Sequence, residues 1–380
     1  MGKVGKNVTV TNAERTEEHA EYYNLEEIKK HKCLYNVIFG KRSNGKTYSV
    51  LREILVNYVK TGKQGAYLRR YREDFVGKRG DQLFQSLVSN GVVKEITGGA
   101  WDRVKYNSSR WYLAREEEGR IISDQTPFCF GFSLSQMEHD KSTSFPDITT
   151  IVFDEFISRV GYLNGEFVIF MNVLSTIIRN RDDVIIYMLG NTVNKYCPYF
   201  QEMGLGHVEN MEEGKIDIYS YGSSKLRVAV ERTRNHNIEG RKSDKYFAFD
   251  NPSLEMITGG AWELDLYPHL PREYGSENVI FKYFISFNDQ LLQAEVLVFD
   301  DCSFTYIHRK TGEIKYPDKD LIFEAEFDPR PNHVRNIKRT ANKVARKLGV
   351  YFQDSRVFYQ DNDVGEIVRN YLQFCSQDHI

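Results

Sequence analysis

The sequence predicts an α/β fold with a largely parallel sheet, followed by a smaller β-rich domain. Apolar runs alternate with helix-like stretches from residue 34 to about residue 193, an order that puts parallel strands in one sheet with helices on its faces. Three β-rich runs separated by turn signals follow after residue 277, as in an antiparallel meander. With 380 residues, the chain is long enough for more than one core.

The composition is that of an ordinary globular protein. Hydrophobic residues make up 41% of the chain, charged residues 27%, and the formal net charge is −2, so nucleic-acid binding would need local basic patches. The chain has no apolar run of membrane-spanning length, and its N-terminus lacks an apolar export signal. We therefore expect a cytoplasmic protein without membrane contact. The five scattered cysteines predict reduced structural thiols.

We expect three segments along the chain. Residues 1–228 hold the alternating elements, with strands at 35–39, 66–69, 128–134, 148–153 and 184–189. Residues 229–276 are rich in charge, proline, glycine and asparagine, which is typical of a linker subdomain. Residues 277–380 combine the meander with helices at about 333–348 and 364–375.

A glycine-rich loop follows the first strand. The letters GKRSNGKT fit G-x-x-x-x-G-K-[ST] and lie between an apolar strand and a helix, the context in which this motif binds phosphates. Backbone N–H groups would surround the phosphates, Lys46 would reach the β- and γ-oxygens, and Thr47 would bind Mg²⁺. The expected ATP-binding residues are Gly40, Lys41, Arg42, Ser43, Asn44, Gly45, Lys46 and Thr47.

The second motif is ITTIVFDEF, an apolar run that ends in Asp154 and Glu155. A buried parallel strand delivers such side chains to its carboxyl end, beside the phosphate loop. Asp154 would then support the Mg²⁺ shell, and Glu155 would orient and polarise the attacking water. Because a kinase of small molecules wants no hydrolytic water, the pair favours an ATPase.

Two further candidates follow this motif. A strand end carries Asn191, which would sense the γ-phosphate. An expected helix ends near Arg179, which could reach into a neighbouring subunit's site as an arginine finger. Otherwise Arg179 and Arg181 are only a helix cap and a solvated charge.

Basic residues also gather in two places. Arg69, Arg70 and Arg72 follow one another in LRRYRED, with Lys78 and Arg79 nearby. The expected helix at 333–348 has basic residues opposite an apolar face formed by Val334, Ile337, Ala341, Val344 and Leu348. Both clusters suit a phosphate backbone, and a solvated surface is the alternative.

Several of these segments, in this order, resemble the DNA-encapsidation ATPases of small podoviruses, motors that package a linear double-stranded genome. They are VIFGKRSNGKTY, AYLRRYRED, DKSTSFPDITTIVFDEF, IIRNRDDVIIYMLGN and NKYCPYF, and they cover about residues 35–200. In the last third the resemblance rests mainly on FKYFISFNDQLLQAEVLVF. It implies a P-loop ATPase of the additional-strand, RecA-like type, followed by a domain like a ribonuclease-H-like nuclease that has lost its metal site.

The resemblance also implies partners and residue roles. It implies a homo-oligomeric ring, a pentamer, that acts in the host cytoplasm and transiently at the portal vertex of a procapsid, where a structural packaging RNA can take part. Lys46, Glu155 and Arg179 would be the catalytic residues, with Arg179 as the finger supplied in trans. Arg72 and Lys141 would face the central channel and grip double-stranded DNA, although Arg72 replaces a lysine, which keeps charge but not geometry.

Two other functions are open. One is a terminase large subunit with an active nuclease; the expected strand VIFKYFISF has no carboxylate, but Asp289, Asp300 and Asp301 lie at turns that folding could gather. The other is a nucleotide-switched binding module, which predicts slow hydrolysis without stimulation by DNA. Glu155 together with a finger-like Arg179 argues against the switch.

Overall fold

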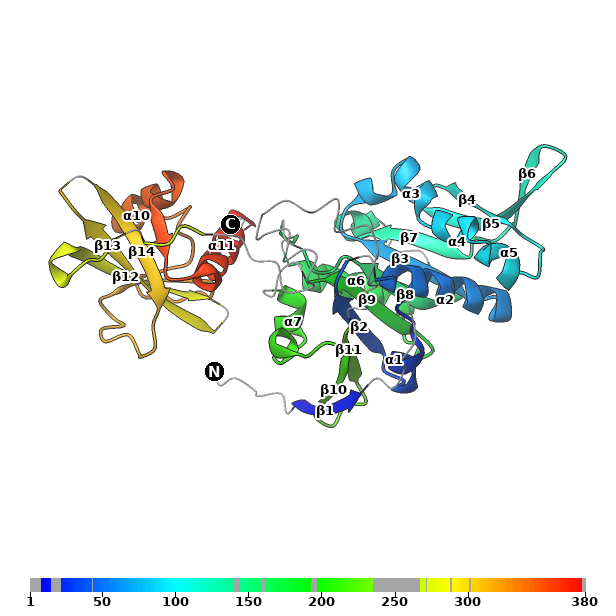
Figure 1. The fold of residues 1–380 in the computed structure, drawn as a ribbon, viewed down its shortest axis with the longest axis horizontal. Coiled ribbons are helices and arrows are strands. Elements are labelled where there is room, and N and C mark those ends of the chain that lie inside the picture. The colour runs from blue at the N-terminus through cyan, green and yellow to red at the C-terminus, as the bar shows by residue number, and fades with distance from the viewer. Residues whose placement is uncertain are drawn as a thin grey trace, which may run out of the picture. The chain divides into compact units, whose positions relative to one another are not determined.

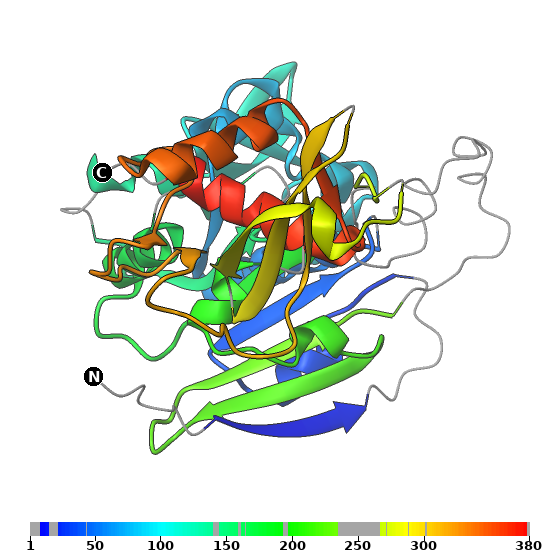
Figure 2. The same ribbon diagram turned by 90° about the vertical axis from the view of Figure 1, so that its left-hand side faces the viewer.

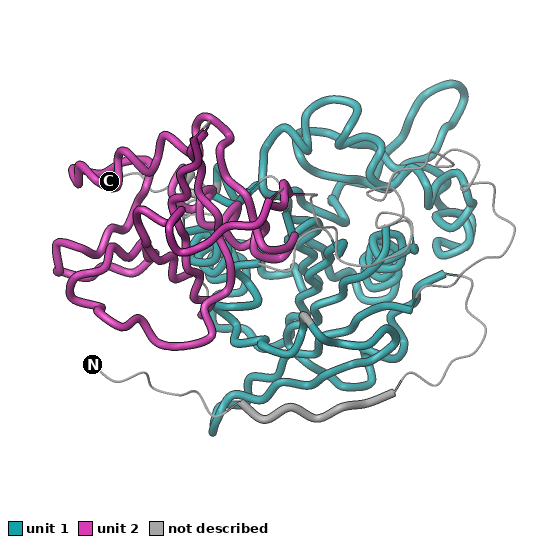
Figure 3. Tube along the Cα trace, turned by 60° about the vertical axis from the view of Figure 1, so that its left-hand side comes forward, with its two compact units in different colours: residues 1–262 teal, residues 263–380 magenta. Residues whose placement is uncertain are grey.

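The computed structural model describes residues 8–14, 22–42, 44–139, 144–158, 161–163, 165–192, 197–234, 267–270, 272–287, 289–300 and 302–377. Its contacts divide the chain into two compact units, residues 1–262 and 263–380 (Figure 3). Neither unit has, among its described residues, a helix long and apolar enough to cross a membrane.

Unit 1 is built on a mixed sheet whose centre is parallel (Figure 1). The central strands, in spatial order, are β11 (Arg227–Arg232), β2 (Tyr35–Gly40), β9 (Ile185–Asn191), β8 (Ile148–Asp154), β3 (Gln64–Arg69) and β7 (Cys129–Ser133). Every residue of β2 and of β8 is buried, the pattern of parallel strands covered on both faces. Strand β9 lies between β2 and β8.

The two edges of this sheet are antiparallel. On one side, β1 (Val8–Glu14) pairs with β10 (Lys215–Tyr221), and β10 pairs with β11 (Figure 2). On the other side, β5 (Arg110–Glu117) joins β7 and pairs with β4 (Arg103–Asn107) and β6 (Arg120–Ser123). The boundary expected at residue 228 therefore falls inside β11, and residues 235–266 of the expected linker lie outside the described part of the chain.

Two long helices cover opposite faces of the parallel strands. Helix α2 (Lys46–Thr61) packs with the side chains of one face, such as Ile38 and Val152, whereas α6 (Glu166–Ile178) packs with the alternate side chains, such as Val37 and Phe153. Short helices complete the unit: α1 (Glu26–Lys30), α3 (Lys78–Gln82), α4 (Gln85–Ser89), α5 (Val92–Ile96) and α7 (Pro198–Glu202). The fold thus sandwiches the expected strands between helices.

Unit 2 contains a mixed sheet with the order β16-β15-β12-β13-β14-β17. The predicted meander is present as β12 (Val279–Phe287), β13 (Gln290–Val298) and β14 (Ser303–Arg309). The short strands β15 (Leu321–Glu324), β16 (His333–Val334) and β17 (Val357–Tyr359) extend it with parallel pairs. Helices α10 (Lys343–Gln353) and α11 (Asn362–Gln377) follow.

The helix predicted at 333–348 was wrong over its first ten residues. Val334 belongs to β16, and the side chain of Asn336 accepts hydrogen bonds from the N–H groups of Lys338 and Arg339, a local turn that competes with a helix. Helix α10 begins only after Asn342, whose side chain caps it. The expected apolar face is therefore broken, with Val344 46% exposed.

Candidate functional site

The carboxyl ends of β8 and β9, together with the loop that follows β2, border a cavity of about 1090 Å³. Open parallel sheets bind ligands at this edge. The lining residues used below are Asn44, Gly45, Lys46, Thr47, Glu53, Asp154, Glu155 and Asn191. Two segments far apart in sequence, the glycine-rich loop and the end of β8, therefore meet in one cavity.

Glycine is required at both ends of the loop. Gly40 has φ +153°, and a Cβ there would lie 2.1 Å from the Thr233 hydroxyl oxygen. Gly45 has φ +95° and directly precedes α2, so that the N-terminus of α2 opens into the cavity. Ser43 of the predicted loop lies outside the described residues.

Lys46 is buried at the base of the loop, where it is 6% exposed. Its ammonium group donates hydrogen bonds to the carbonyl of Lys41 at 2.7 Å, to Asn44 Oδ1 at 3.1 Å and to Asn191 Oδ1 at 3.3 Å. Burial lowers the pKa of Lys46 to about 8, an effect that Asp154 opposes. These oxygens occupy positions that phosphate oxygens could take, and the expected sensor Asn191 lies against the same amine.

Thr47 and Asp154 offer neighbouring oxygens. The Thr47 hydroxyl donates to Asp154 Oδ2 at 3.1 Å, and the same carboxylate oxygen accepts from the Tyr67 hydroxyl at 2.6 Å. Burial raises the pKa of Asp154. Neighbouring oxygens in an octahedral Mg²⁺ shell lie about 2.9 Å apart, so the hydroxyl and the carboxylate fit this ion.

Glu155 directs its side chain from the end of β8 through a strained backbone. Its φ is +57°, a left-handed conformation that non-glycine residues rarely adopt. Its carboxylate is held at 2.6 Å by the guanidinium of Arg69, from the end of the adjacent strand β3. Arg69 also lies 3.4 Å from Asp74 and 3.9 Å from Asp154, so it links all three carboxylates.

Arg70 turns away from solvent instead of joining a basic surface. It forms a buried ion pair with Glu166, the first residue of α6, at 2.7 Å, and it donates to the backbone carbonyls of Glu155 and Phe156. The expectation that Arg69 and Arg70 suit a phosphate backbone was therefore wrong, because both are paired within the protein. Arg72 of the same cluster is exposed in a short helical turn.

Arg179 lies at the opposite end of α6. The helix begins beside Arg70 and Glu155 and runs for thirteen residues, which is about 20 Å at the α-helical rise. Arg179 follows at its C-terminus and is not among the residues that line the cavity. Lys141 lies outside the described residues.

Unit 2 brings together one group of possible metal ligands among its described residues: Glu324, Asp328 and His333. His333 Nδ1 contacts Glu324, and Arg330 donates to both oxygens of Asp328 at 2.9 and 2.8 Å. The carboxylates are thus already paired with basic side chains. Asp289 and Asp300 are exposed, and Asp301 lies outside the described residues.

Glu295, a carboxylate on the central strand β13 of this sheet, is also paired. Strand β12 carries no carboxylate, and Glu295 of β13 is buried against Lys282 at 3.0 Å and Tyr274 at 2.7 Å. Among the described residues of unit 2, the carboxylates of Asp289, Glu295 and Asp300 therefore do not come together as possible metal ligands.

Comparison with known proteins points in one direction. Residues 18–221 match the model of a protein family described as podovirus DNA encapsidation protein (Gp16). The DNA packaging protein of Bacillus phage phi29 is 28% identical over 182 residues, and that of Bacillus phage B103 is 27% identical over 175 residues. These matches cover 47% and 45% of this chain, and the chain spans only about half the length of either relative, 49% and 48%.

Two solved structures share the fold. The phi28 gp11 DNA packaging motor aligns with a TM-score of 0.53 at 18% identity, over 95% of this chain and 99% of that chain. The bacteriophage phi29 viral genome packaging motor assembly aligns with a TM-score of 0.51 at 20% identity, over 94% and 100%.

Proposed function

Because this chain belongs to the podovirus DNA encapsidation protein (Gp16) family, we propose that it is an ATPase that drives double-stranded DNA into a phage procapsid. The observation that carries the proposal is the cavity where Lys46, Thr47, Asp154 and Glu155 converge. In this arrangement the glycine-rich loop would bind the phosphates, and the Glu155 carboxylate would act as the base that accepts a proton from the attacking water. The two packaging proteins of phages phi29 and B103 support the choice of DNA as the substrate of the motor.

ATP and Mg²⁺ are the ligands that we assign to this cavity. Backbone N–H groups of the loop and the Lys46 ammonium would bind the β- and γ-phosphates, while Thr47 and Asp154 would hold Mg²⁺. The ion would neutralise charge on the phosphates. Glu155 would accept a proton from the attacking water once it leaves Arg69, and Asn191 would sense loss of the γ-phosphate through its contact with Lys46.

The motor would work as a homo-oligomeric ring of five subunits at the portal vertex, after synthesis in the host cytoplasm. Its partners would be DNA, the portal and a structural packaging RNA. Arg179 suits a finger supplied in trans, because α6 carries it away from its own cavity. Arg72, which is exposed, would contact DNA, and so would Lys141.

We assign residues 1–232, which include the whole of β11, to the ATPase domain, 233–276 to a linker subdomain and 277–380 to a nucleic-acid-binding domain derived from a ribonuclease-H-like nuclease. An antiparallel meander continued by parallel β15 and β16 supports that derivation. Loss of cleavage agrees with the absence of a carboxylate in β12 and the pairing of Glu295.

Steady-state ATP hydrolysis with and without linear double-stranded DNA tests the proposal. We expect DNA to stimulate hydrolysis by the wild-type protein, and we expect no cleavage of plasmid in the same samples supplied with Mn²⁺. Hydrolysis indifferent to DNA would favour the nucleotide switch. Cleavage that disappears in Glu324→Gln would favour an active terminase nuclease.

The buried amine predicts how ATP affinity depends on pH. With a pKa of about 8, Lys46 is about 90% protonated at pH 7 and about 10% protonated at pH 9. Only the charged amine attracts phosphate, so we expect the dissociation constant of ATP to rise about tenfold between these pH values. Equilibrium titration of wild type measures it. The Lys46→Met variant should bind ATP weakly at both pH values, and an equal pH dependence in that variant would refute the assignment.

The same pKa predicts the pH dependence of stability without nucleotide. Between about pH 8 and about pH 10.5 the unfolded chain holds a proton on Lys46 that the folded chain lacks, so the contribution of Lys46 to the free energy of unfolding rises with pH. The free energy of unfolding of wild type minus that of Lys46→Met, measured by chemical denaturation, should therefore increase between about pH 8 and about pH 10.5 and stay constant well below pH 8. This control separates loss of folding from loss of phosphate attraction.

A further inference from the structure

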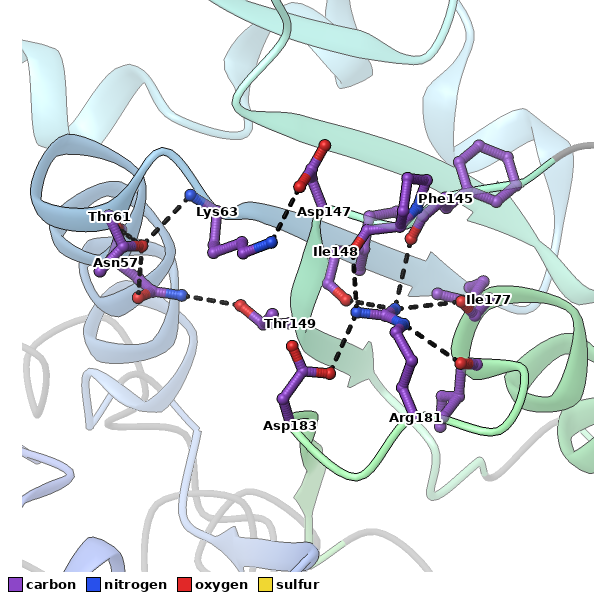
Figure 4. A network of polar contacts seen from close by, with 12 residues as sticks. Asn57, Thr61, Lys63, Phe145, Asp147, Ile148, Thr149, Ile177, Arg181 and Asp183 are labelled. Atoms are coloured by element: carbon purple, nitrogen blue, oxygen red, sulfur yellow. Dashed lines mark hydrogen bonds and ion pairs between the residues drawn. The ribbon is translucent and has the colours of Figure 1, made fainter.

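Arg181 joins two segments that are distant in sequence (Figure 4). Its guanidinium donates hydrogen bonds to five backbone carbonyls and one carboxylate: Ile177 at 3.2 Å, Ile178 at 3.2 Å, Phe145 at 3.3 Å, Pro146 at 3.1 Å, Ile148 at 2.6 Å and Asp183 Oδ1 at 3.2 Å. The first two carbonyls end α6, and the next three lead into β8. One side chain thus fastens the end of the helix to the start of the strand.

The segment 145–149 is also fastened from its other side. Asp147 pairs with Lys63 at 2.9 Å, and Thr149 accepts a hydrogen bond from Asn57 of α2 at 3.0 Å (Figure 4). Helix α2 starts at the phosphate loop. A continuous set of contacts therefore runs from α2 through residues 145–149 to Arg181.

Arg179 sits within the turn that Arg181 closes. Its backbone has φ +44°, a conformation that costs free energy for a residue with a side chain and persists where surrounding contacts enforce it. The N–H of Arg181 donates to the carbonyl of Ile178 at 3.3 Å, and its guanidinium bonds to the same carbonyl. These contacts fix the backbone on both sides of Arg179.

We propose that Arg181 is a positioning residue that sets the placement of the Arg179 finger for the neighbouring subunit. The inference rests on the proposed function, in which Arg179 acts in trans. A guanidinium is required because its planar fork reaches several acceptors at fixed angles, whereas a lysine ammonium has three donors on one atom and cannot span both segments.

Kinetics of ATP hydrolysis by the assembled protein with linear DNA test this role. Arg181→Lys should lower kcat about ten- to a hundredfold, since a displacement of about 1 Å in a catalytic group has effects of this size. The KM for ATP should change less than about twofold, because the chain's own cavity is intact. Arg103→Lys, which alters an arginine paired with Glu116 on the edge hairpin, should behave as wild type.

A double-mutant cycle shows whether Arg181 acts through Arg179. In an Arg179→Ala background, Arg181→Lys should reduce kcat no further. Independent, multiplicative losses would overturn the inference, as would wild-type kcat in Arg181→Lys alone. If Arg179→Ala itself leaves kcat unchanged, the finger assignment in the proposed function fails, which is a separate result.

Mixing experiments separate positioning from damage to the fold. Arg181→Lys subunits retain Glu155, and Glu155→Gln subunits retain a well-placed finger, so an equal mixture of the two should hydrolyse ATP faster than either variant alone. A mixture no faster than Arg181→Lys alone would show that Arg181→Lys has damaged its own site, and would overturn the inference.

Discussion

Glu155→Gln should abolish steady-state ATP hydrolysis, with turnover reduced about a thousandfold, the size of effect expected when a general base is removed. The amide cannot accept the proton of the attacking water. ATP binding should persist, because Lys46, Thr47 and Asp154, which would bind the nucleotide and the metal ion, line the cavity independently of Glu155. Hydrolysis assays combined with equilibrium binding of ATP measure both effects on the same protein.

The matched control is Glu53→Gln. Glu53 lines the same cavity and pairs with Lys29 at 2.5 Å, so this variant removes an acidic charge from the cavity without touching the end of β8. We expect near-normal turnover. Normal turnover in Glu155→Gln would instead show that another group activates water, and would remove the main reason for placing the reaction here.

Arg69 and Glu155 form an ion pair that the proposed reaction would have to break. The Glu155 carboxylate lies 2.6 Å from the Arg69 guanidinium and is engaged as its ion-pair partner. The strained backbone at Glu155 places the side chain at the rim of the cavity, where it is 57% exposed. A change of partner, rather than a change of fold, would therefore bring the base to the water.

The site was predictable where short sequence distance encodes geometry. The loop from Gly40 to Thr47 follows β2 directly, and Asp154 and Glu155 end the continuous apolar run of β8. Parallel strands meet at their carboxyl ends, so the convergence of the two motifs followed from strand order. Asn191 lies beside Lys46 for the same reason, since it ends β9, the strand between β2 and β8.

Partners set by strand adjacency could not be predicted in this way. Arg69 reaches Glu155 only because β3 lies next to β8, and Arg70 reaches Glu166 only because α6 starts beside that edge. In the sequence both look like members of a basic cluster. Likewise, β1 forms only because β10, which lies far along the chain, pairs with it.

The helix error near residue 333 has a similar cause. Apolar residues recur there at helical spacing. Val334 and Ile337 are indeed buried, but Val334 belongs to a strand and Ile337 to the turn that follows it. Two asparagine side chains, of Asn336 and Asn342, hold the backbone out of a helix until residue 343. The spacing of apolar residues does not reveal that these side chains compete with the helix for backbone N–H groups.

Arg179→Ala should lower hydrolysis by the assembled protein about a thousandfold, an effect of the size expected when an arginine finger is lost. Without the guanidinium, the charge that develops on the transferred phosphate lacks its partner in the transition state. Affinity for ATP should change little, since Arg179 does not line the cavity of its own chain. The control Arg103→Ala removes an arginine from the edge hairpin and should hydrolyse ATP normally.

Mixing Arg179→Ala with Glu155→Gln subunits distinguishes a finger in trans from one in cis. Each variant alone lacks one catalytic group, but in a mixed ring an Arg179→Ala subunit keeps Glu155 and receives Arg179 from a Glu155→Gln neighbour. An equal mixture should then recover about a quarter of wild-type hydrolysis, because about one interface in four pairs the two variants in the productive order. A finger in cis predicts no recovery at any ratio. Arg179 follows the last residue of α6 and does not line the cavity of its own chain, which is the structural reason to expect recovery.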